Sequence, residues 1–176
     1  MHLSLLPFYT NTADQEFRNA VRDTMRGKST LLHGTSLGSM IVRTDTLLYP
    51  HVGEPKISFT RSPETAVHFA TLPKDFDDGL PTVFVLDRHS LRFRHKIEPH
   101  QDPAPDSHTF GKFEMEERIW QRDVRPVSQH LRAIVFGFGH HIFTLTSTAE
   151  FRKVYLPIAV FCAAESIHIR SNHKAP

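Results

Sequence analysis

The sequence LLHGTS at residues 31–36 decides the fold, because an apolar run delivers a histidine, a glycine and two hydroxyl side chains in succession. Leu37 and Ile41 follow at helical spacing, so we interpret this stretch as a buried strand that ends in a polar turn and enters a short helix. The turn would place His33 at the lip of a sheet and leave the Gly34 backbone open to a ligand.

Two later segments carry side chains suited to a pocket around this turn. Residues 57–62 (ISFTRS) hold a short strand followed by Ser62, the hydroxyl cap of a helix that continues with a proline and an acid. Residues 114–119 (EMEERI) fit a strand, on which Glu114 and Glu116 share one face, and they also fit an exposed amphipathic helix.

The rest of the chain predicts an α+β fold. Strands outnumber helices after residue 30 and lack the alternation of a doubly wound sheet, so we expect a split mixed or antiparallel sheet with short flanking helices. Ala66, Phe69 and Ala70 form the predicted buried face of the helix after Ser62. We predict helices over residues 13–25, 63–70, 88–91 and from 147, strands over residues 82–86, 92–98, 131–136, 156–161 and 167–169, and loops over residues 43–56, 73–81 and 99–112.

The composition indicates an ordinary globular protein. With 176 residues we expect one domain over residues 1–176, with an N-terminal helical segment at 1–28 and a frayed tail at 170–176. The formal net charge of +2 is too weak to indicate nucleic acid or a membrane surface. The single cysteine, Cys162, lies in an apolar run and is interpreted as a buried, inert thiol in a reducing compartment.

No membrane or secretion signal is expected. Pro7 interrupts the N-terminal apolar run, no basic residue precedes it, and nothing approaches the ~20 apolar residues of a membrane span. We therefore expect a cytoplasmic protein that makes no contact with a membrane.

The order of the three segments resembles the ADP-ribosyltransferase superfamily, whose members take NAD and transfer ADP-ribose. The His-Gly-Thr turn is similar to the branch of diphtheria toxin and the poly-ADP-ribose polymerases. The Glu-x-Glu run is similar to the branch of arginine-modifying toxins, so the chain resembles a mixture of the two over residues 31–161. The resemblance implies that family's split-sheet fold and the activity of a mono-ADP-ribosyltransferase. The small size of the chain would suit a bacterial or phage effector.

The resemblance also implies an NAD-binding set. His33 would bond a ribose hydroxyl with help from Thr35, and the Gly34 backbone would hold the nicotinamide carboxamide. Phe59 would stand where the family stacks an aromatic ring on the nicotinamide, although the usual tyrosine is absent unless Tyr49 takes that role. Ser58 and Thr60 would flank Phe59, and Arg61 or Arg43 would reach the pyrophosphate.

The catalytic acid is implied to be Glu116, with Glu114 as the first acid of the Glu-x-Glu pair and His33 beside them. Glu117 is the alternative if the register is shifted by one residue. Cleaving the nicotinamide–ribose bond generates a cation, which a carboxylate in a partly dry cleft stabilises better than water does. This reaction needs no metal.

Other functions remain open. The same fold would also suit an NAD glycohydrolase, in which water is the acceptor, or a catalytically inactive binding module. The acceptor of a transferase would be a protein or a nucleic acid, although basic clustering is too sparse to favour the RNA 2′-phosphotransferases that share the fold. We predict no metal site, because His100, His108, His140 and His141 lack the spacing of zinc ligands.

Overall fold

The computed structural model describes residues 11–50, 53–72, 80–100, 116–138 and 141–161. In these residues the chain forms an α+β fold of two antiparallel sheets and flanking helices, which confirms the predicted class. The helices are α1 Asn11–Met25, α2 Gly38–Thr44, α3 Pro63–Thr71, α4 Arg88–Arg94, the 3₁₀ turn η1 Val127–Gln129, α5 Thr148–Glu150 and the π-helical segment η2 Phe151–Tyr155. The strands are β1 Thr30–Thr35, β2 Lys56–Phe59, β3 Thr82–Asp87, β4 Glu98–His100, β5 Glu116–Trp120, β6 Leu131–Phe138 and β7 His141–Leu145.

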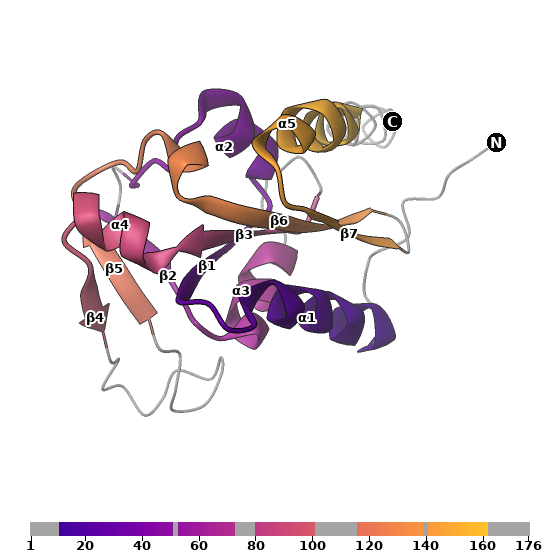
Figure 1. The fold of residues 1–176 in the computed structure, drawn as a ribbon, viewed down its shortest axis with the longest axis horizontal. Helices are drawn as coiled ribbons and strands as arrows, with labels where there is room; N and C mark the ends of the chain where they lie inside the picture. The colour runs from indigo at the N-terminus through magenta and orange to yellow at the C-terminus, as the bar shows by residue number, and fades with distance from the viewer. Residues whose placement is uncertain (1–10, 51–52, 73–79, 101–115, 139–140, 162–176) are drawn as a thin grey trace, which may run out of the picture.

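The larger sheet has the order β1-β3-β6-β7 and forms the centre of the molecule. Helices α1 and α3 cover one face, and α2 and the α5–η2 helix cover the other (Figure 1). Because side chains alternate across a strand, β1 sends Leu31 into one core and Leu32 into the other. Strand β3 is buried on both faces, as its apolar, β-branched sequence predicts.

The smaller sheet has the order β2-β5-β4 and lies to the left of the larger one in Figure 1. Leu32 of β1 and Thr60, just after β2, exchange backbone hydrogen bonds of 2.8 and 2.9 Å and so join the two sheets. Apart from this bridge, β1 pairs with β3 and β2 pairs with β5, so the strands form two sheets that meet at one point.

Three helices begin with a side-chain cap, and the cap predicted at Ser62 is confirmed. The Ser62 hydroxyl accepts from the Thr65 N–H at 3.1 Å, and Asp87 accepts from the Ser90 N–H at 2.7 Å. Ser147 forms a complete capping box at the start of α5. Each cap satisfies an N–H group that the helix itself leaves without a partner.

Three sequence predictions are wrong. Residues 156–161 are helical, because the helix begun at Ser147 continues through η2 instead of ending before an apolar strand. Residues 92–98 do not form a strand, because the helix that Asp87 caps extends to Arg94 and leaves only β4 at this edge. Phe69 is 43% exposed, whereas Ala66 and Ala70 are buried as predicted.

Several predictions lie outside the described residues. They concern Glu114, Cys162 and residues 1–10 of the N-terminal segment. They also concern most of the loops predicted at 73–81 and 99–112, the strand at 167–169 and the tail at 170–176. Within the described part of the chain, no helix combines the length and the apolarity that crossing a bilayer requires.

Candidate functional site

A cavity of about 440 Å³ opens where the two sheets separate. All three segments that the sequence singled out contribute to its wall, although they are far apart along the chain. The cavity lies beside the bridge between Leu32 and Thr60, so the split in the sheet creates it. We call it the cleft; its lining includes His33, Gly34, Leu48, Pro50, Lys56, Ser58, Phe59, Thr60, Phe69, Glu116 and Arg118.

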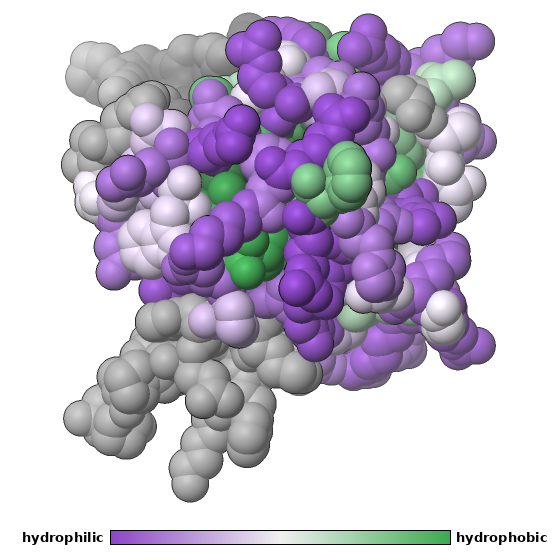
Figure 2. Space-filling model, turned by 60° about the vertical axis from the view of Figure 1, so that its left-hand side comes forward, coloured by the Kyte–Doolittle hydropathy of each residue, from purple (hydrophilic) through white to green (hydrophobic). Residues whose placement is uncertain are grey.

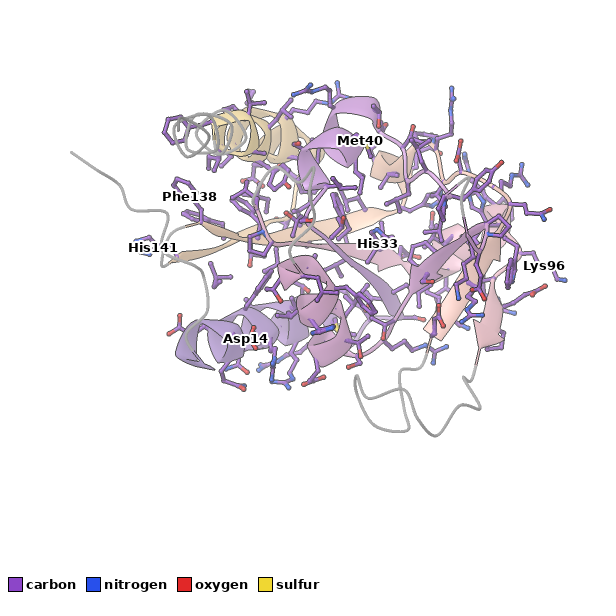
Figure 3. The ribbon with its side chains drawn as sticks, turned by 180° about the vertical axis from the view of Figure 1, so that it is seen from behind. Asp14, His33, Met40, Lys96, Phe138 and His141 are labelled. Carbon is purple, nitrogen blue, oxygen red and sulfur yellow. The ribbon has the colours of Figure 1, made fainter. Side chains whose placement is uncertain are left out.

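His33 lies on β1 near the middle of the molecule (Figure 3) and contacts the neighbouring strand β2. Its Nδ1 lies 3.0 Å from the Ser58 carbonyl oxygen. A carbonyl only accepts, so Nδ1 carries the proton and Nε2 is the acceptor nitrogen in the neutral ring. The partly buried imidazole is thereby oriented by β2 while it remains part of the cleft wall.

Gly34 is required by close packing. A Cβ atom at this position would lie 1.8 Å from the carbonyl oxygen of Ala66 in α3. Since backbone cannot retreat as a flexible side chain does, only glycine lets α3 approach β1 this closely. The approach brings the start of α3, including Thr65, to the cleft.

Strand β2 contributes residues of two kinds. Ser58 lies on the cleft face and hydrogen-bonds the Glu116 carboxylate. Thr60 also lines the cleft, and its hydroxyl accepts from the Ser62 N–H at 3.0 Å. Phe59 points into the apolar core with 1% exposure, and its ring centroid lies 5.9 Å from that of His33. Phe59 therefore supports the imidazole and offers little open face for stacking.

Glu116 begins β5, which is the strand interpretation of the acidic segment and excludes a helix at residues 116–120. Arg118 donates a hydrogen bond of 2.6 Å to one carboxylate oxygen, and the Lys56 ammonium lies 3.6 Å from the other. Burial, the largest effect, raises the pKa of Glu116, but hydrogen bonds from Arg118 and Ser58 and the charge of Lys56 outweigh it. The pKa lies below its ordinary value of 4.5, so the carboxylate is ionised at neutral pH.

Two cations of the cleft, Lys56 and Arg118, were missed by the sequence prediction. The Arg118 side chain is 9% exposed, and its buried Nε has no hydrogen-bond partner among the described residues. A buried guanidinium N–H without a partner is costly, and an anionic or carbonyl oxygen in the cleft would satisfy it. The strand alternation from Glu116 was the signal that places Arg118 on the same face.

The outer wall of the cleft is apolar. Phe69 from α3 and Leu48 from the segment after α2 are 43% and 52% exposed, and both line the cavity together with Pro50. Phe69 is the accessible aromatic ring of the cleft. Helical spacing alone assigned it to the core, and only the position of α3 against the smaller sheet reveals its exposure.

Three other candidate residues lie elsewhere. Glu117 points to the opposite face of β5, is 2% exposed, and pairs with Arg61 and with Arg88, whose Nε lies 2.9 Å from the carboxylate. The Thr35 hydroxyl accepts from the Leu37 N–H at 3.0 Å, and Thr35 is not among the residues that line the cleft. Arg61 is likewise outside the lining.

The two alternatives to these residues also lie outside the cleft lining. Tyr49 packs against the core, and its backbone N–H donates to Asp123 at 3.2 Å. Arg43 is exposed near the end of α2. Among the described residues, no three His, Cys, Asp or Glu side chains form a group that could hold a metal ion.

Comparisons with protein-family models, curated proteins and solved structures found no match to this chain. The functional argument therefore rests on the cleft: an oriented imidazole, an ionised carboxylate, two cations and an exposed aromatic ring within one cavity.

Proposed function

We propose that the protein is an NAD-dependent mono-ADP-ribosyltransferase that transfers ADP-ribose to a protein or nucleic acid and releases nicotinamide. The observation that carries the proposal is the convergence of His33, Ser58 and Glu116 on one cleft. The cavity of about 440 Å³ lies within the range of about 300–1,000 Å³ typical of ligand sites. As part of the same proposal, the split between the two sheets corresponds to the cleft of the ADP-ribosyltransferase fold.

The polar residues of the cleft suit the two halves of a dinucleotide. The His33 imidazole, oriented by the Ser58 carbonyl at Nδ1, lines the cleft and is placed to exchange a hydrogen bond with a ribose hydroxyl. Arg118 and Lys56 line the cleft as cationic hydrogen-bond donors suited to a ligand carrying phosphates, and Lys56 also pairs with Glu54 at 2.5 Å outside the cleft lining. The buried Nε of Arg118 offers a directed hydrogen bond to such a ligand.

Glu116 is the residue placed to assist bond cleavage. In the proposed reaction the nicotinamide leaves the ribose with the bonding electron pair, and the ribose becomes cationic. The ionised Glu116 carboxylate stabilises this cation and orients a ribose hydroxyl. The acceptor then forms a bond to the same ribose carbon and loses a proton.

One observation favours a second candidate, a module that binds the dinucleotide without cleaving it. Both oxygens of Glu116 already face cations, Arg118 at 2.6 Å and Lys56 at 3.6 Å. A carboxylate neutralised in this way stabilises a neighbouring ribose cation less. Transfer would then require a bound ligand to draw Arg118 or Lys56 away from the carboxylate.

The test measures nicotinamide release from NAD by chromatography, and NAD binding by calorimetry. We expect release by the native protein, loss of release in Glu116→Gln, and retention in Glu16→Gln, a matched change on the exposed face of α1. Binding without release by the native protein would select the binding module. Absence of both binding and release would overturn the proposal.

A further inference from the structure

A second cavity, of about 370 Å³, lies away from the cleft at the end of α4. Arg94, Arg122 and Arg125 line it together with His95 and Asp123. It brings the last turn of α4 next to the segment that follows β5, on the side of the molecule shown in Figure 2. We use the name α4 surface for Arg92, Phe93, Arg94, Arg122 and Arg125.

The arginines of the α4 surface differ from others in the protein. Arg22, Arg61, Arg88, Arg118 and Arg132 each pair with a carboxylate. Within the described ranges no acidic side chain pairs with any of the four arginines of the α4 surface. The acid in the cavity, Asp123, accepts from the Tyr49 backbone instead.

Two buried histidines, His95 in the cavity lining and His130 packed against it, lie close enough to these arginines for the positive charge to affect their pKa values. Burial is the main cause that lowers the pKa of His95, and the charges of Arg122 and Arg94 lower it further. Burial also lowers the pKa of His130, which is packed edge-on against His95 at 5.9 Å between ring centroids. The histidines are therefore neutral at pH 7 and the arginines supply the charge of this surface.

Phe93, which follows Arg92 and precedes Arg94 in the last turn of α4, adds a flat apolar ring at this end of the helix. It is 90% exposed, which is far above any other large hydrophobic residue of the described chain. Figure 2 shows this side of the molecule as largely hydrophilic, with isolated hydrophobic residues among the polar ones. An aromatic ring in that position gains nothing from the fold, because it contacts almost no protein.

We propose that the α4 surface binds single-stranded nucleic acid. The planar fork of arginine matches phosphate oxygens, and unpaired arginines retain their full hydrogen-bonding capacity for them. An exposed aromatic ring stacks on an unpaired base of any sequence. A nucleic acid presents a phosphate and a base in every repeating unit, so one class of ligand supplies both the anion for the arginines and the flat face for Phe93. This surface is separate from the cleft, and binding at it does not depend on turnover of NAD.

The experiment measures fluorescence anisotropy of labelled oligothymidylate and oligouridylate 12-mers at several salt concentrations. We expect Arg122→Gln/Arg125→Gln to weaken binding about tenfold or more at 0.1 M salt and to reduce the salt slope by about 1.4. We expect Phe93→Ala to weaken binding at least about fivefold with an unchanged slope, because stacking does not release counterions. The control, Arg152→Gln/Lys153→Gln, removes the same charge from exposed positions on η2 and should bind like the native protein.

Three results would overturn the proposal. The first is the absence of saturable binding of either 12-mer at low salt. The second is an equal loss in the η2 control, which would show attraction to net charge alone. The third is displacement of the 12-mer by polyglutamate at equal charge concentration, which would identify an acidic protein as the better occupant. Circular dichroism of each variant shows that the exposed substitutions leave the fold intact.

Discussion

At the scale of single residues, two neighbouring glutamates have opposite surroundings. Glu116 lines the cleft, whereas Glu117 is buried on the reverse face of β5 between Arg61 and Arg88. The cause is the alternation of side chains along a strand, which separates adjacent residues by the thickness of the sheet. Two chemically identical side chains therefore have different surroundings: Glu116 faces the cleft, and Glu117 joins an ion cluster inside the fold.

This difference predicts that Glu117→Gln destabilises the protein. The substitution leaves Arg61 and Arg88 facing an uncharged amide, and hydrogen bonds to charged groups contribute about 1.5–3 kcal/mol. Urea unfolding should show a loss of about that size relative to the native protein. Glu116→Gln should lose clearly less, and equal losses in the two variants would contradict this assignment.

The residues of the cleft were partly predictable. The His33 turn, Ser58 and Glu116 carry recognisable residue types at strand ends, and they share one cavity. Phe69 and Lys56 could not be assigned to the cleft, because their exposure depends on how α3 and β2 are placed by distant strands.

At the scale of elements, the sequence predicted helix starts correctly where a capping residue marked them, and it failed where only an apolar composition was available. The caps at Ser62 and Ser147 are short-range hydrogen-bond patterns, and both helices begin where these residues predict. The apolar run at 156–161 carries no such signal, because a short buried strand and a buried helix share the same composition. Pro157 lies within the helix that begins at Thr148, so it does not open a strand.

The contact of α3 with β1 predicts a large effect of Gly34→Ala. The added methyl group would overlap the Ala66 carbonyl, so α3 must shift or the strand must bend. Overpacking of this kind costs about 1–3 kcal/mol, which urea unfolding would measure. NAD binding should weaken in the same variant, because α3 carries Thr65 and Phe69 to the cleft. A native unfolding midpoint would show that α3 is not held against β1 this closely.

At the scale of the whole molecule, strand pairing brings together residues that no local sequence pattern connects. The formal net charge of +2 was too weak to indicate nucleic acid, yet the fold gathers Arg94, Arg122 and Arg125 around one cavity. Likewise β2 pairs with β5 across more than 50 residues of chain, a long-range contact that has no local pattern. Because β2 pairs with β5 and lies outside the sheet that contains β1, the strands form two sheets.

The buried histidines predict a pH-dependent stability of the whole fold. In the folded state the pKa values of His95 and His130 are lowered from 6.5, so below that pH the unfolded chain binds more protons. Stability should therefore fall as the pH drops below about 6.5, by at most about 1.4 kcal/mol per pH unit for each histidine.

Urea unfolding between pH 7.5 and 5 would measure this slope. His95→Phe removes one of the two titrating groups and should flatten the slope below pH 6.5. An unchanged slope in that variant would assign the acid sensitivity to other groups.

The mutual hydrogen bonds between Leu32 and Thr60 have a mechanical consequence. They pin the two sheets together at the inner end of the cleft, so any widening must pivot there and grow toward the rim. The ion cluster around Glu117 lies on the reverse face of β5 and resists such rotation. A small rotation of the two sheets about the Leu32–Thr60 bridge would therefore widen the cleft for an elongated ligand while the sheets stay joined.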